Sequence, residues 1–192
     1  ETCVQNFLSD YYSTPESWGV KKSAKQVLTA LNNWLFGQSQ RFTDTRKGYV
    51  STLSAIIFKS HSAHIFHVGD SRVYRLRNNS IEQITRDHAR PMSDQQSYLT
   101  RAMGLDVKLD VDYQAVPLQT GDFFFLSTDG IHDFVSDKDI ASLVQKNSSN
   151  LEAACQQLIA LALANQSHDN LSCQILRIDA LPKQKMDDVV SR

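Results

Sequence analysis

The sequence is short of the residues that mark several common classes of protein. Its 192 residues include only 3 cysteines, 4 prolines and 7 glycines. The widely spaced cysteines exclude a disulfide framework and a Cys-x-x-Cys zinc site, and they favour a reducing compartment. No apolar run approaches the roughly 20 residues of a membrane-spanning helix, and no signal peptide is visible. We therefore expect a cytoplasmic protein that does not bind a membrane.

An excess of charge of either sign is also lacking. Lys and Arg number 20 and Asp and Glu number 21, so the formal net charge is −1. A nucleic-acid-binding domain needs a basic field, and this sequence has none, so we expect no nucleic-acid partner. Hydrophobic residues make up 41% of the chain. That fraction and this length suit one domain with a sizeable core.

Helical and strand-like periodicities occupy different parts of the chain. Apolar residues at helical spacing predict helices over 1–12, 20–37 (with Gly37 as C-cap) and about 150–165. Short apolar and β-branched runs predict an antiparallel meander of strands. These four strands are expected at 49–58, 64–68, 73–76 and 81–84.

Later segments complete the predicted layout. Residues 86–104 read as a loop with a little helix at 92–100, and strands are expected at 107–116 and 171–178. The run at 123–126 is apolar without alternation, which predicts a central strand covered on both faces. Ser136 followed by Asp139 predicts a capped helix start. We expect an α+β layered fold over 1–180 and a tail or linker at 181–192.

Three aspartate-centred strings lie where apolar runs meet loops. They occupy 68–72, 128–133 and 168–170. Taken singly, each is better explained as a turn than as a metal site, because Asp and Asn bond their own backbone and Gly130 permits a tight turn. Taken together they are carboxylates without a cysteine or histidine set, and oxygen ligands select Mg²⁺ or Mn²⁺ over zinc. Such ions commonly serve phosphoryl chemistry.

Other candidate sites are weaker. His61, His64 and His67 are three residues apart, so neighbours fall on opposite faces of a strand, as in ordinary sheet and turn histidines. No G-x-S-x-G string surrounds Ser127, which disfavours a serine hydrolase. No glycine-rich phosphate loop is present.

Six strings in a fixed order resemble the metal-dependent protein phosphatases of type 2C. They are G-Y-V-S-T at 48–52, V-G-D-S-R-V-Y at 68–74, I-T-R-D-H at 84–88, L-T-R-A-M-G at 99–104, T-D-G-I-H-D at 128–133 and D-N-L-S at 169–172. The resemblance implies an α-β-β-α sandwich of two antiparallel sheets with outer helix pairs. It also implies that two bridged Mg²⁺ or Mn²⁺ ions activate a water that attacks a phosphoserine or phosphothreonine.

The resemblance assigns roles to particular residues. Asp129 and Asp169 match the family's core metal ligands, and Asp70 and Asp133 match positions at a third, weaker metal. Asn170 matches the residue that orients a neighbouring ligand. No residue of the chain other than these ligands matches a catalytic position.

The chain departs from the family pattern at its N-terminal side. The R-x-x-N-E-D and D-G-x-G-G strings are absent, and the only Asp-Gly is at 129–130. We therefore expect an N-terminally truncated domain that lacks strands, exposes sheet edges, binds the metal pair poorly and turns over little. The alternative is a non-catalytic pseudophosphatase that binds phosphoproteins. Expected partners are a phosphoprotein substrate and, from the polar tail, a fused or separate protein kinase.

Overall fold

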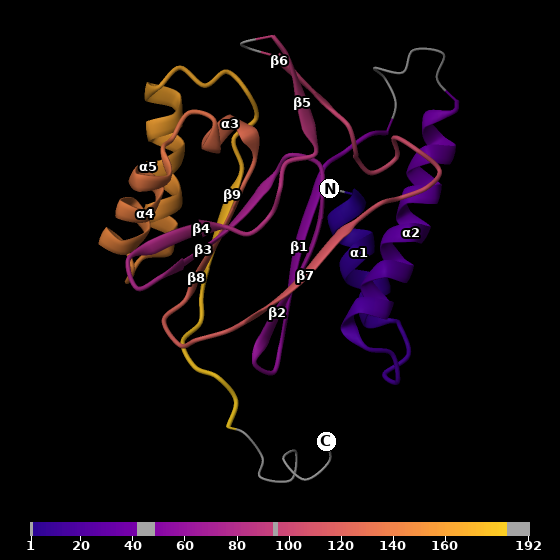
Figure 1. Cartoon of the computed structure of the whole chain (residues 1–192), viewed down its shortest axis with the longest axis horizontal. Coiled ribbons are helices and arrows are strands. Elements are labelled where there is room, and N and C mark those ends of the chain that lie inside the picture. Colours follow the sequence, from indigo (N-terminus) through magenta and orange to yellow (C-terminus); the bar gives the residue numbers. More distant parts are fainter. Residues whose placement is uncertain (1, 42–48, 94–95, 184–192) are drawn as a thin grey trace.

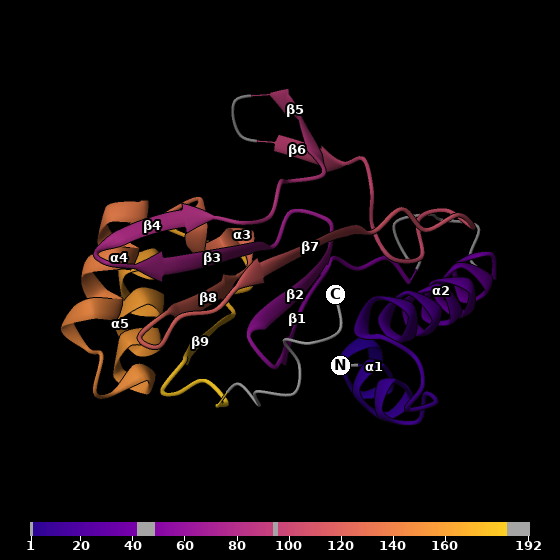
Figure 2. The same ribbon diagram turned by 60° about the horizontal axis from the view of Figure 1, so that its bottom comes forward.

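Two antiparallel sheets lie face to face between two layers of helices. The structure, a computed structural model, describes residues 2–41, 49–93 and 96–183. Figures 1 and 2 show one helix pair outside each sheet. The predicted α+β sandwich is therefore confirmed. Most of the predicted tail, residues 184–192, lies outside the described residues.

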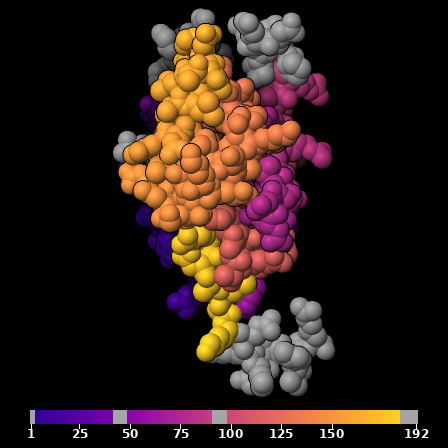
Figure 3. Space-filling model, turned by 90° about the vertical axis from the view of Figure 1, so that its left-hand side faces the viewer, coloured from indigo at the N-terminus to yellow at the C-terminus, as the bar shows by residue number. Residues whose placement is uncertain are grey.

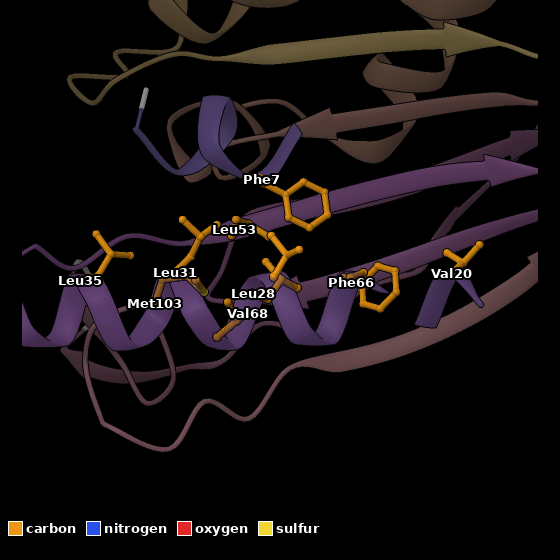
Figure 4. Packing of buried hydrophobic residues seen from close by; sticks show 11 residues of the cluster. Phe7, Val20, Leu28, Leu31, Leu35, Leu53, Phe66, Val68 and Met103 are labelled. Carbon is orange, nitrogen blue, oxygen red and sulfur yellow. The ribbon is translucent and has the colours of Figure 1, made fainter. Parts of the chain in front are cut away.

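The first sheet has the strand order β1-β2-β7 and is covered by the two N-terminal helices. Its core forms because Phe66 and Val68 of β2 present apolar side chains to one face of α2, which contributes Leu28 and Leu31 (Figure 4). The elements are α1 (Thr2–Tyr12), α2 (Val20–Ser39), β1 (Leu53–Lys59), β2 (Ser62–Val68) and β7 (Asp112–Pro117).

The second sheet has the order β4-β3-β8-β9 and is covered by α4 and α5, which fill the face seen in Figure 3. The Ser136 hydroxyl accepts a hydrogen bond from the Asp139 N–H at 3.2 Å, so the predicted cap of α4 is confirmed. The elements are β3 (Arg72–Arg77), β4 (Ser80–Gln83), β8 (Phe123–Ser127), α3 (Asp129–His132), α4 (Asp137–Lys146), α5 (Leu151–Ala164) and β9 (Cys173–Arg177).

Strand β8 is buried on both faces, as its unbroken apolar run predicts. Phe124 packs between the sheets with Ile65 and Val73, whereas Phe125 packs against the helical layer with Ile140 and Leu158. Because β8 lies between β3 and β9, both of its edges are also paired.

The structure differs from three of the sequence expectations. The four-strand meander is wrong, because β1 and β2 pair in one sheet and β3 and β4 in the other. Helix at 92–100 is wrong as well, since β5 (Ala89–Ser93) and β6 (Gln96–Leu99) form a hairpin there. Gly37 does not cap α2, which continues to Ser39.

In the described ranges, no helix combines the length and apolarity needed to cross a bilayer.

Candidate metal centre

Strand register brings the three aspartate strings to one end of the second sheet. Arg72 of β3 pairs with Ser127 of β8, which pairs in turn with Cys173 of β9. The residues just before β3, just after β8 and just before β9 therefore emerge at the same end. Figure 1 shows α3, the loop before β9 and the β5–β6 hairpin gathered there.

Asp70 is positioned by a tight connection between the two sheets. Gly69 has φ of +112°, and a Cβ at this position would lie 2.5 Å from Thr52 Cβ, so only glycine fits. The Thr52 and Ser71 hydroxyls share a hydrogen bond of 2.7 Å. The turn from β2 to β3 is thereby fixed, and it directs Asp70 into a pocket.

That pocket, which we call the acid pocket, is hollowed among carboxylates and has a volume of about 230 Å³. Asp129 enters it as the first residue of α3, and Asp133 enters it as the C-cap of the same short helix. Its lining consists of Asp70, Asp87, Ala89, Arg90, Asp129, His132 and Asp133. Three of the four predicted metal ligands therefore share one pocket.

Crowding of like charges marks this pocket electrostatically. Burial raises the pKa of Asp70, and the nearby charge of Asp129 raises it further. Burial also raises the pKa of Asp133, with Asp129 adding to the shift and Arg72 opposing it. The charge of Asp129 therefore destabilises the ionised forms of Asp70 and Asp133, and a bound divalent cation would relieve this repulsion.

Among the described residues, Asp169, the fourth predicted ligand, does not line the acid pocket. The loop that carries it nevertheless packs against the start of α3 beside the pocket. Its Oδ1 accepts from the Asn170 N–H at 2.6 Å. The Asn170 carbonyl in turn accepts from the Thr128 hydroxyl at 3.0 Å. A Cβ on Gly130 would lie 2.7 Å from that carbonyl oxygen, so the close approach requires glycine. Asn170 thus meets Asp169 through its backbone.

The sequence alone assigned no role to three further residues at the acid pocket, the ion pair of Arg72 with Asp87 and the buried His132. Arg72 donates to both carboxylate oxygens of Asp87 at 2.7–3.1 Å, and its Nη2 lies 4.0 Å from Asp133. His132 is buried and shares a 2.9 Å hydrogen bond with the Ser127 hydroxyl. Burial, followed by the charge of Arg72, lowers the pKa of His132 to about 4. Arg72, Asp87 and His132 each lie inside one of the six strings that resemble the phosphatase family. Their place in these strings is the sequence feature that could have indicated a role at the site.

The carboxylate oxygens of the pocket are the type of ligand that a hard cation prefers, but too few of them converge within the described residues to hold one. Carboxylate oxygens suit Mg²⁺ and Mn²⁺, and Mg²⁺ commonly keeps several waters and takes only one or two carboxylates. Among the described residues, however, no three His, Cys, Asp or Glu side chains converge closely enough to hold an ion by themselves. Any ion here would need ligands beyond these side chains.

Comparison with known proteins identifies the family. Residues 2–169 match the family model described as protein phosphatase 2C, and the chain belongs to this family. The serine/threonine phosphatase Stp of Listeria welshimeri is 28% identical over 151 residues, which cover 71% of this chain. This chain spans 60% of the length of that Listeria relative. PstP of Mycobacterium tuberculosis is 30% identical over 145 residues, covering 66% of this chain and 27% of PstP.

Solved structures agree with the fold. The crystal structure of a bacterial serine phosphatase superposes with a TM-score of 0.78 at 25% identity, covering 95% of this chain and 80% of the other. The M. tuberculosis PstP structure gives 0.80 at 24% identity, covering 93% and 81%, which shows the fold alone. A further structure holds the catalytic domain of PstP in complex with 2 manganese ions.

Proposed function

We propose that the protein carrying this chain hydrolyses phosphoserine and phosphothreonine in proteins, with Mg²⁺ or Mn²⁺ held in the acid pocket. The single observation that carries the proposal is that Asp70, Asp129 and Asp133 line the same pocket of a protein phosphatase 2C chain. The relatives named as serine/threonine phosphatases support the substrate class.

Four carboxylates are assigned to metal binding, three of them in the acid pocket and the fourth, Asp169, on the loop beside it. Asp129 and Asp169 are the proposed core ligands, and Asp70 and Asp133 serve an additional ion. Bound ions of this kind lower the pKa of a coordinated water and neutralise charge on the transferred phosphoryl group. Burial, together with repulsion from Asp129, raises the pKa values of Asp70 and Asp133, and this supports the assignment.

Other residues of the pocket would position these ligands and the substrate. Arg72 holds Asp87 and lies near Asp133, so it fixes one wall of the pocket. His132 remains neutral above a pH of about 4 and adds no positive charge to compete with a cation. Arg90 lines the pocket and makes no ion pair within the described ranges, so its guanidinium is available to a phosphate oxygen.

The natural setting is part of the same proposal. Three cysteines without a disulfide suit the cytoplasm. The substrate is a phosphoprotein, and a protein kinase, fused or separate, is the partner that would supply it.

A phosphopeptide assay tests the proposal. Release of inorganic phosphate from phosphothreonine peptides is measured with the natural protein that carries this sequence, in Mn²⁺ and then in EDTA. Release that requires the metal, and that falls in the Asp129→Asn variant, is the expected result. Release that is unaffected by EDTA would contradict it.

A second candidate function is favoured by one observation, the lack of three converging ligands in the described part of the chain. It is a pseudophosphatase that binds phosphoproteins without cleaving them. Binding of phosphothreonine peptides with no phosphate release in Mn²⁺ would establish this function in place of hydrolysis.

A further inference from the structure

A second cavity runs beside β7, the edge strand of the first sheet. It has a volume of about 580 Å³ and shares no lining residue with the acid pocket. Its walls come from α2, β2, residues 84–86 and residues 109–114. We call it the β7 groove.

The backbone of β7 is open toward this side. The Leu118 N–H donates to the His61 carbonyl at 2.9 Å, just beyond the end of the β2–β7 ladder. Successive residues of an antiparallel strand bond alternately to opposite sides, so Tyr113 and Ala115 direct their N–H and C=O groups away from β2. In the described ranges no strand pairs with that edge. An edge of this kind can accept an added strand.

Positive charge lines the groove. Lys21 and Lys25 lie one helical turn apart on α2, and Arg86 faces them from the segment that follows β4. Lys21 Nζ lies 4.5 Å from the centroid of the Tyr113 ring. Within the described ranges, none of the three cations forms a salt bridge with a carboxylate.

Both acids of the groove are already paired with other side chains. Arg101 Nη1 lies 3.1 Å from Asp110 Oδ2 and 2.8 Å from Asp112 Oδ1. His88 Nδ1 accepts from the Gly69 N–H at 3.2 Å, so Nε2 carries the hydrogen and donates to Asp112 at 3.1 Å. Arg101 and the three groove cations together outnumber these two carboxylates, so the net charge offered to a ligand is positive.

The groove also leads toward the candidate metal centre. Arg86 lines the groove, and the next residue, Asp87, lines the acid pocket. A chain lying along the start of β7 would therefore pass within a short distance of the acid pocket. A compact anion would use the cations but leave the strand edge unused, so the combination favours an extended peptide.

We propose that the β7 groove docks an extended acidic segment of the substrate protein, which adds a strand at Tyr113 and Ala115 and pairs its carboxylates with Lys25 and Arg86. The inference rests on the proposed function only in assigning that segment to a substrate. Main-chain pairing would provide affinity, and the cations would select acidic side chains.

Fluorescence anisotropy with a labelled eight-residue peptide of alternating Glu and Thr tests the docking. The peptide carries no phosphate and no metal is added, so failure to bind is separate from failure to hydrolyse. The double variant Lys25→Glu/Arg86→Glu should weaken binding by about tenfold or more. The matched variant Lys138→Glu/Lys146→Glu changes the same charge on α4 and should stay within about twofold.

Two altered peptides complete the test. A peptide with Lys in place of Glu should bind at least about tenfold more weakly. A peptide with alternate amides methylated keeps its charge but loses edge pairing, and it should also bind more weakly. Equal binding by either peptide or by the Lys25/Arg86 variant, or no binding at about 1 mM, overturns the proposal. Circular dichroism checks the variants, and the milder Lys25→Gln/Arg86→Gln replaces any that unfolds.

Discussion

Strand β8 carries an aspartate at each end, and the two are treated in opposite ways. Asp122 precedes the strand, is 1% exposed and accepts two hydrogen bonds of 2.6 Å from Arg77. Asp129 follows the strand, and in the described part of the chain no Lys or Arg pairs with it. The fold thus supplies a cation to one carboxylate and places the other among further carboxylates.

The pKa shifts follow the same division. Burial raises the pKa of Asp122, but hydrogen bonds from Arg77 and the Gln119 N–H outweigh it, so the net shift is downward. Asp70, beside Asp129, shifts upward. The ionised form of Asp122 is therefore stabilised by its surroundings, whereas the ionised form of Asp70 is destabilised.

The largest expected effect on stability comes from removing the ion pair of Asp122 with Arg77. Asp122→Ala leaves the Arg77 guanidinium without its carboxylate partner and should lower the free energy of unfolding by about 3–5 kcal/mol. Urea denaturation measures the loss. The control is Asp110→Ala, which removes an exposed carboxylate from Arg101 and should cost about 1 kcal/mol or less. Equal losses in the two variants would contradict the distinction.

His67, which is buried in the first sheet, differs from both aspartates because the fold favours its neutral form. Burial, and then the electrostatic influence of the neighbouring His88 ring, lowers the pKa of His67 to about 4. The hydrogen bond to the Arg86 carbonyl and the charges of Asp112 and Asp87 oppose this shift without cancelling it. The unfolded chain therefore binds more protons than the folded protein between pH 6.5 and about 4.

Stability contributed by neutral His67 is present above pH 6.5 and is lost as the pH falls toward about 4. The loss can reach about 3 kcal/mol. His67→Asn removes this titration, and its amide can still meet the Ser54 hydroxyl, which lies 2.9 Å from His67 Nδ1. Urea denaturation at about pH 7 and about pH 4.5 should show a smaller fall for the variant. Parallel falls would contradict the assignment.

Substitution of Asp129, the aspartate that follows β8, should change activity rather than stability. Asp129→Asn removes one charge from the acid pocket, so the free energy of unfolding should stay constant or rise slightly at about pH 7. Phosphopeptide turnover by the natural protein should fall on the order of 100-fold, because a proposed core metal ligand is lost. Destabilisation as large as that of Asp122→Ala would show that Asp129 is structural.

The smallest effect concerns the contact that seats the Asp169 loop. Gly130→Ala would place a Cβ 2.7 Å from the Asn170 carbonyl oxygen and should cost about 1–3 kcal/mol. Gly37→Ala is the matched control, because nothing lies within 4 Å and the helix continues through this position. That control should stabilise α2 by about 1 kcal/mol. Thermal unfolding of both variants provides the comparison.

Local signals in the sequence predicted the elements better than their pairing. The cap at Ser136 and the two-sided burial of β8 depend on neighbouring residues, and both are confirmed. The meander failed because β2 and β3 pair with β7 and β8, about fifty residues away, and strand periodicity does not specify a distant partner.

The candidate site shows the same limit. The aspartate strings were visible because charge beside an apolar run is conspicuous, and register brings them together. The pairing of Arg72 with Asp87 and the burial of His132 depend on side-chain packing across strands, which no single string reveals. Asp169 matched a family motif, yet its side chain does not line the described pocket.

Titration of Mn²⁺ into the natural protein, followed by calorimetry, tests the central claim most directly. Saturable binding should be lost in Asp129→Asn and Asp70→Asn and kept in the Asp110→Asn control, whose carboxylate is paired with Arg101. Absence of Mn²⁺ binding, or binding by Asp129→Asn equal to that of the unaltered protein, would contradict the assignment of the acid pocket as a metal centre.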